Sequence, residues 1–225
     1  TRASPVLWSL RTGTRSRTDK AGAGVLTSPA AATSPVLFRV GQTPSCGQLP
    51  VRRPYRSGVE SVEQRLVTPF YLAMMGLNAT EHAGDRADDL VRVGRTATVT
   101  DVKQLLAAGA WRPVVMGAWL SVAFSPKDLG PDLLLAVTRC QGSFTAPPLS
   151  VAAYLVLGAD AGTALTKYVF RARDDERLGS ATFVAAVVEA LGGQPAVPPR
   201  EEDRVDLAGM VGVAWRLRTA LTATS

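Results

Sequence analysis

Three stretches of the chain are apolar on nearly every face, and they recur at a regular interval. They are centred near residues 118, 153 and 186, so neighbouring stretches lie about 35 and 33 residues apart. A helix that is apolar all round is buried all round. Amphipathic helices paired with buried ones at such an interval are typical of helical repeat proteins. Since no run alternates with the period of a strand, the pattern predicts an all-α fold.

The first of these stretches, residues 111–124, is the clearest. In the sequence WRPVVMGAWLSVAF, after the first three positions, only Gly117 and Ser121 are neither bulky nor apolar. We therefore expect a central buried helix with Met116 and Trp119 in the core. Gly117 is then predicted to be the point at which a neighbouring helix approaches closely.

Capping residues, prolines and glycines predict where the other helices begin and end. The segment 60–76 is expected to be helical, with Pro69 either kinking it or starting the helix proper. The polar segment 77–97 is expected to be a loop around at most one short helix. The remaining predicted elements are a helix capped by Thr100, one opened by Pro131 over 132–140, one opened by Pro148 over 149–157, an amphipathic one capped by Asp160, one capped by Ser180 and stopped by Gly192–Gly193, and a last one over 204–220.

Charge and composition divide the chain near residue 59. Residues 1–58 hold nine basic residues and one acid, Asp19, whereas residues 59–225 hold 16 basic and 18 acidic residues. Ser, Thr, Gly and Pro make up 26 of the first 58 positions, so this part has too little apolar surface to offset its ordering entropy. We predict a disordered basic leader, 1–58, followed by a helical repeat domain, 59–225.

The leader admits three interpretations. A basic arm for nucleic acid is disfavoured, because its charges are scattered and its aromatic residues are sparse. An organelle transit peptide fits the Arg- and Ser-rich composition, but the excess of 21 Arg over four Lys is typical of a GC-rich bacterial genome. The third interpretation, that the segment is not native coding sequence, is favoured because no Met precedes Met74 and order is predicted from Val59.

Two segments carry a resemblance to a known family. VTPFYLAMMG at 67–76 and VTDVKQLLAAGAWRPVVMGAWLSVA at 99–123 resemble an uncharacterised bacterial family, domain-of-unknown-function family 6000. The resemblance covers mainly residues 67–123, and a later helix at 160–170 adds to it. It implies a HEAT-like helical repeat stack, either an α-solenoid fragment or an irregular helical bundle. It implies no activity.

The most distinctive triplet of the chain is Trp111–Arg112–Pro113. Trp111 and Arg112 are the candidate partner-binding residues, because an aromatic ring beside a guanidinium suits a ligand groove. The competing interpretation is structural: Trp111 fills a helix junction and Arg112 pairs with an acid such as Asp101. We favour the structural interpretation, since aromatic residues at helical spacing usually belong to the core.

Other candidate chemistry is sparse. The acidic turn Asp174–Glu176 suits either a hard cation or local ion pairs with the flanking arginines, and the second is favoured. Two cysteines and one histidine are too few for most metal sites, so we expect no metal and no cofactor. His82 lies in the stretch with the least predicted structure, which disfavours a general-base role. The longest apolar run spans about 12 residues, too short for a membrane helix.

These observations favour a non-catalytic module that binds another protein in the bacterial cytoplasm. The alternative is a nucleic-acid-binding or DNA-repair-type enzyme on a HEAT-like scaffold. The near-neutral balance of residues 59–225 counts against it, because strong phosphate binding needs a basic face.

Overall fold

The computed structural model describes residues 60–223, which form helices and contain no strand. The all-α prediction is confirmed for this part of the chain. The predicted disordered leader, 1–58, lies outside the described residues. The helices are α1 (Val62–Leu66), α2 (Tyr71–Met74), α3 (Ala79–His82), the 3-10 turn η1 (Ala83–Arg86), α4 (Ala87–Gly94), α5 (Val99–Ala107), α6 (Trp111–Ser121), α7 (Pro126–Arg139), α8 (Ala146–Leu157), the 3-10 turn η2 (Gly158–Ala161), α9 (Gly162–Asp174), α10 (Ala181–Ala190) and α11 (Glu201–Thr222).

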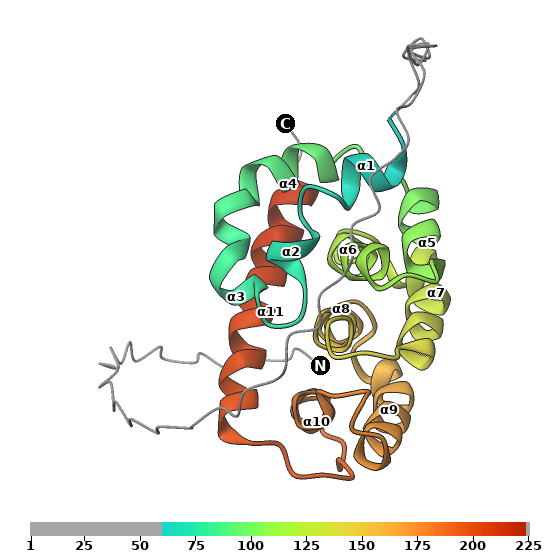
Figure 1. Ribbon diagram of the computed structural model, residues 1–225, viewed down its shortest axis with the longest axis vertical. Helices are drawn as coiled ribbons and strands as arrows, with labels where there is room; N and C mark the ends of the chain where they lie inside the picture. Colours follow the sequence, from blue (N-terminus) through green and yellow to red (C-terminus); the bar gives the residue numbers. More distant parts are fainter. Residues whose placement is uncertain (1–59, 224–225) are drawn as a thin grey trace, which may run out of the picture. The chain divides into compact units, whose positions relative to one another are not determined.

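The middle of the described chain consists of successive helix pairs. Helix α5 packs against α6, α7 against α8, and α9 against α10. In Figure 1, α6, α8 and α10 are seen end-on in one row, and α5, α7 and α9 form a second row beside it. Contacts within each row join neighbouring pairs, so the pairs stack on one another.

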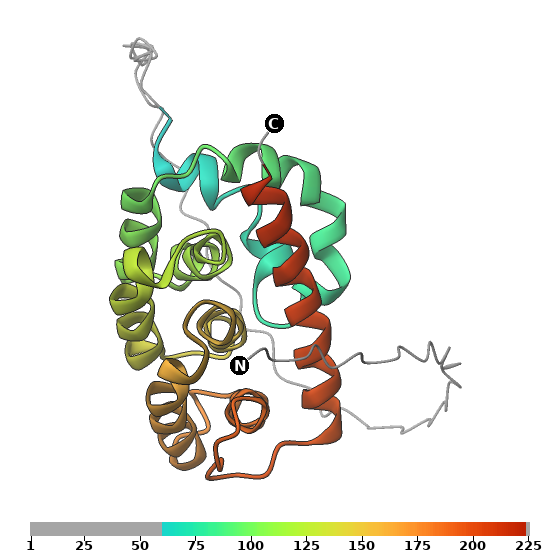
Figure 2. The ribbon, with the colours of Figure 1, turned by 180° about the vertical axis from the view of Figure 1, so that it is seen from behind.

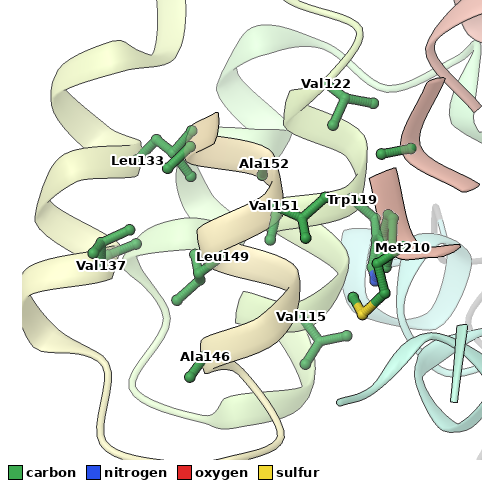
Figure 3. Packing of buried hydrophobic residues seen from close by; sticks show 14 of the residues in the cluster. Val115, Trp119, Val122, Leu133, Val137, Ala146, Leu149, Val151, Ala152 and Met210 are labelled. Carbon is green, nitrogen blue, oxygen red and sulfur yellow. The ribbon is translucent and has the colours of Figure 1, made fainter. Parts of the chain in front are cut away.

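The inner row holds the core, as the apolar sequence runs predict. Met116 and Trp119 of α6 are 0% and 1% exposed, which confirms the prediction for both. Helix α8 is buried along most of its length, and α10 contributes a continuous apolar run from Phe183 to Val188. Figure 3 shows Trp119 beside Met210 of α11, with Val151 of α8 close by.

Gly117 lets α6 approach α5 closely, also as predicted. A Cβ atom added at this glycine would lie 3.0 Å from Leu105 Cβ and 3.0 Å from the Leu106 backbone nitrogen. Both contacts belong to the last part of α5, and one of them is to backbone. A larger side chain at this position would therefore push the two helices apart.

Helix α11 lies across the stacked pairs and joins them to the first helices. It contacts α8 and α10 on one side and α3 and α4 on the other. Figures 1 and 2 show it running alongside the other helices from α10 to α4. The first helices are also joined to the stacked pairs directly. Trp119 Nε1 of α6 donates a buried hydrogen bond to the Met74 carbonyl oxygen of α2 at 2.7 Å.

The structure corrects two predictions near the start of the described chain. The segment 60–76 is not one helix: α1 ends at Leu66 and α2 begins at Tyr71, with Pro69 in the turn between them. The segment 77–97 is mostly helical rather than a loop, because α3, η1 and α4 follow one another without a break. Leu90 of α4 is buried at 2% exposure, and the two valines of this helix pack partly buried against the core, so α4 has an apolar face.

Several predicted helix starts are also wrong by a few residues. Thr98, not Thr100, caps α5, and its hydroxyl accepts from the Asp101 backbone N–H at 3.1 Å. Helix α7 begins at Pro126, so Pro131 lies inside it rather than opening it. Asp160 lies within η2 and does not cap α9.

Ser180 occupies the N-cap position of α10, but its side chain makes no cap hydrogen bond. Its φ of 54° is left-handed, and it is the one non-glycine residue among 60–223 with a positive φ. Gly179 before it has a φ of 62°. The turn from α9 into α10 thus depends on backbone conformation and not on a capping hydroxyl.

One stretch of residues 60–223 is longer and more apolar than the sequence runs suggest. Ala146–Asp174, which joins α8, η2 and α9, could cross a membrane by length and composition alone. Within it, α8 ends at Leu157 and Gly158 has a φ of 55°. Helix α8 contacts α6, α7, α10 and α11, and the core helix of a soluble protein passes the same test.

Candidate binding groove

Trp111 lies at the centre of an aromatic cluster at the start of α6. Its ring centroid is 5.6 Å from that of Tyr71 in an edge-to-face contact and 5.2 Å from that of Phe144. Tyr71 comes from α2, and Phe144 from the loop between α7 and α8. The Gly76 backbone N–H donates to the Phe144 carbonyl at 2.9 Å, which ties that loop to the α2–α3 turn.

Arg112 stacks on this cluster and does not pair with Asp101. Its guanidinium carbon lies 5.1 Å from the Tyr71 ring centroid and 4.9 Å from that of Trp111. Asp101 instead pairs with Arg65 at 3.3 Å and accepts from the Thr98 backbone N–H at 3.0 Å. The Thr98 backbone hydrogen bond, with help from Arg65, lowers the pKa of Asp101. The predicted Arg112–Asp101 pair is therefore wrong, because Arg112 stacks on the two aromatic rings and Arg65 is the arginine that pairs with Asp101.

A groove of about 470 Å³ opens beside Trp111, and we call it the Trp111 groove. One wall comes from the end of α5 and the start of α6, and the other from α7 and the loop after it. The lining residues that bear on its chemistry are Leu106, Trp111, Val114, Leu135, Arg139 and Phe144. Leu135 and Phe144 are 45% and 48% exposed, so large apolar side chains face solvent at its mouth.

The polar groups of the Trp111 groove are few. Asp132 lines it, and this carboxylate lies 3.4 Å from the Lys103 ammonium. Arg139 also lines it and makes no ion pair with any residue of 60–223. Arg171 of α9 donates to the Cys140 carbonyl at 3.4 Å, next to the same wall, and stacks 5.6 Å from the Tyr168 ring centroid.

Of the two candidate residues predicted from the sequence, one lines the groove. Trp111 lines the groove, whereas Arg112 stacks on its Tyr71 side and is not part of the lining. Phe144, Leu135 and Arg139 were missed as site residues. A sequence signal existed for Phe144, since a single aromatic residue in the polar loop QGSFT has no helical partner to pack against.

The acidic turn consists of local ion pairs. Asp174 pairs with Arg173 at 2.7 Å and Asp175 with Arg177 at 2.9 Å. Within residues 60–223, no three His, Cys, Asp or Glu side chains are grouped so that they could hold a metal ion. His82 is half-exposed and lies 3.8 Å from Asp85.

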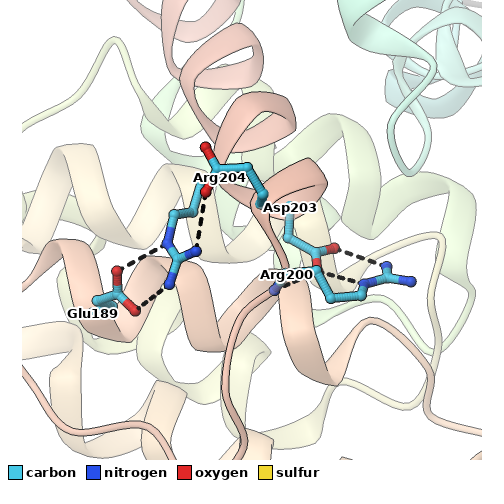
Figure 4. A network of polar contacts seen from close by, with 5 residues as sticks. Glu189, Arg200, Asp203 and Arg204 are labelled. Carbon is cyan, nitrogen blue, oxygen red and sulfur yellow. Dashed lines mark hydrogen bonds and ion pairs between the residues drawn. The ribbon is translucent and has the colours of Figure 1, made fainter.

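An ionic network lies around the first turn of α11 and is drawn in Figure 4. Arg204 donates to both carboxylate oxygens of Glu189 at 3.0 Å. Arg200 donates to both oxygens of Asp203, which is only 3% exposed. Burial opposes ionisation of Asp203, but the interactions with Arg200 and the Thr182 hydrogen bond together outweigh it and lower the pKa of this carboxyl. The network fixes the start of α11 to α10, so its role is structural.

Cys140 and Tyr168 are also explained by packing. Cys140 is buried, with its sulfur 3.1 Å from the Thr145 hydroxyl. The Tyr168 hydroxyl lies 3.0 Å from the carbonyl oxygens of both Leu178 and Gly179, where it secures the α9–α10 turn. Burial raises the pKa of Tyr168 far above its ordinary value, so the hydroxyl stays protonated as a donor.

Comparison with known proteins adds no relative to these observations. No family model matches the chain, and neither the curated proteins nor the solved structures yield a match. The function is therefore argued from the Trp111 groove itself.

Proposed function

We propose that the protein is a non-catalytic interaction module that holds a segment of another protein in the Trp111 groove. The carrying observation is the exposure of large apolar side chains around a formed cavity: Leu135 and Phe144 are almost half exposed beside Trp111. Large contiguous apolar patches are rare on the surface of monomeric proteins, and those that occur often mark a binding site.

The size and composition of the groove suit a few side chains of a partner. Its volume of about 470 Å³ lies in the range of pockets that enclose small ligands or anchor residues. Tryptophan and arginine are the residue types that dominate binding energy at protein interfaces. Trp111 is held by Tyr71 and Phe144, so it presents its ring with little loss of side-chain freedom.

We also propose that the stacked helix pairs are HEAT-like repeats. The repeated order of an outer and an inner helix in α5–α6, α7–α8 and α9–α10 supports this. Membership of domain-of-unknown-function family 6000 rests on residues 67–123 and stays a hypothesis, as do a bacterial source and a cytoplasmic location. A DNA-repair-type enzyme remains the alternative, and oligonucleotide binding is its test.

A peptide library displayed on phage tests the proposal with the full chain as bait. The selected peptides are then measured by fluorescence anisotropy against Phe144→Glu and Phe170→Glu. These are matched variants, because Phe144 and Phe170 are 48% and 47% exposed, and Phe170 lies outside the Trp111 groove on α9. We expect Phe144→Glu to weaken binding at least ~10-fold and Phe170→Glu to change it less than ~2-fold.

Circular dichroism must first show that both variants fold. Equal loss of binding in both variants, or loss in Phe170→Glu alone, would refute the proposal. Binding of a duplex oligonucleotide at physiological salt, in preference to any peptide, would favour the enzyme alternative.

A further inference from the structure

We infer that the segment bound in the Trp111 groove is acidic as well as apolar, with an Asp or Glu side chain next to its apolar anchor. This inference rests on the proposed function and specifies the partner of the same groove. It follows from the charges around the groove, from how the guanidinium groups are held, and from the apolar walls between them.

The charges around the groove are unbalanced in favour of arginine. Its lining carboxylate, Asp132, is already paired with Lys103 at 3.4 Å. Arg112, Arg139 and Arg171 make no ion pair with any part of the chain that the structure describes. A partner carboxylate would therefore meet guanidinium groups that no carboxylate within 60–223 occupies.

Two of these arginines are restrained before any partner binds. The Arg112 guanidinium lies within 5.1 Å of two ring centroids, those of Tyr71 and Trp111. Arg171 is stacked on Tyr168 and donates to the Cys140 carbonyl. A restrained guanidinium loses little side-chain entropy on binding, and its planar donors match the two oxygens of a carboxylate.

Arg139 is the arginine that lines the groove directly. It is exposed at the end of α7, on the same wall as Leu135. A side chain that fills the apolar part of the groove would thus place a neighbouring carboxylate within the range of Arg139. Because apolar lining residues lie next to Arg139, the groove suits a short peptide motif that combines an apolar residue with an acidic one.

The surroundings favour a peptide over a polyanion. Residues 60–223 hold 16 basic and 18 acidic residues, so this part of the chain carries no net positive charge. Nucleic acid binding depends on many simultaneous phosphate contacts. The exposed side chains of Leu135 and Phe144 offer a phosphate neither a charge nor a hydrogen-bond donor, but they suit an aliphatic or aromatic side chain.

The test compares the phage-selected peptides on the full chain and on two charge variants. Arg139→Glu reverses the charge in the groove, and Arg216→Glu reverses an exposed arginine of α11 as a control. We expect enriched peptides to share an Asp or Glu beside a Leu, Phe or Trp. We expect Arg139→Glu to weaken their binding at least ~10-fold and Arg216→Glu to leave it within ~2-fold. Exchanging the peptide acid for Lys should restore binding to Arg139→Glu.

The outcomes separate this inference from the proposed function. Peptides that lose binding in Phe144→Glu but carry no shared acid, and tolerate Arg139→Glu, refute the acidic partner and leave the groove function standing. Peptides that tolerate Phe144→Glu refute both. If Arg139→Glu and Arg216→Glu weaken peptide binding equally, the weakening comes from the change in net charge and not from the groove, and the inference is refuted.

Discussion

Replacing Gly117 by alanine tests the packing of α6 on α5 with a single added methyl group. The new Cβ would lie 3.0 Å from the Leu106 backbone nitrogen and 3.2 Å from the Leu105 carbonyl carbon. These distances are shorter than ordinary van der Waals contact, and backbone atoms of a packed helix cannot rotate away as a side-chain end can. We therefore expect Gly117→Ala to force α5 and α6 apart.

The expected magnitude comes from two opposing effects. Alanine is the better helix former by up to ~1 kcal/mol per residue. Overpacking a dense core costs ~1–3 kcal/mol. The net change at Gly117 is therefore a loss of up to ~2 kcal/mol of unfolding free energy, and Gly117→Leu should lose more.

Gly212 of α11 provides the matched control, because it also lies inside a helix. An added Cβ there would meet only the Arg216 side chain, at an ordinary 3.6 Å. Gly212→Ala should thus stabilise the protein by ~0.5–1 kcal/mol. The assay is urea unfolding followed by circular dichroism, supported by thermal melts, where ~1 kcal/mol shifts the Tm of a domain of this size by ~2–4 °C.

The two alanine variants are expected to change the unfolding free energy in opposite directions. If Gly117→Ala stabilises the protein as much as Gly212→Ala does, then α6 does not pack closely on α5 at this glycine. The stacking of the inner and outer rows at that pair would then have to be abandoned.

Three further predictions concern single side chains. Trp119→Phe should cost ~1–3 kcal/mol in urea unfolding, because the Met74 carbonyl loses its buried donor; an unchanged midpoint would contradict this. Ser180→Gly should raise stability by ~1 kcal/mol by relieving the left-handed φ of 54°, and a lower Tm would contradict it. Burial and repulsion from Asp203 and Glu202 raise the pKa of Asp206, so its folded-state carboxylate holds a proton more tightly than in the unfolded chain. Asp206→Asn should therefore stabilise the fold at neutral pH, with the gain vanishing as pH falls through the raised pKa to the ordinary 3.8, whereas a pH-independent gain would exclude this cause.

The buried helices were predictable because their evidence is local. The residues of α6 are apolar on nearly every face, so its burial can be predicted without knowing which helices pack against it. Cap positions were predicted less well where two candidates compete. Thr98 and Thr100 are both plausible caps of α5, and only the spacing from Thr98 to Asp101 gives the reciprocal pair of hydrogen bonds.

The groove could not be predicted because its walls meet only through packing. Trp111 was found by its local triplet, but Phe144 and Arg139 join it only because α7 stacks beside α5. The Arg112–Asp101 pair failed for the same reason. Asp101 finds Arg65 in α1, 36 residues away, and nothing in the local sequence shows that contact.

The position of α11 has a consequence for the order in which the chain folds. The stacked pairs are made of contacts between segments close in sequence, which form quickly and can accumulate while the chain is being synthesised. Helices α3 and α4, by contrast, depend on α11, which lies more than a hundred residues further along. These two helices gain their contacts with α11 only after the last part of the chain is made, so a nascent chain passes through a stage in which the stacked pairs are formed and the first helices are still exposed.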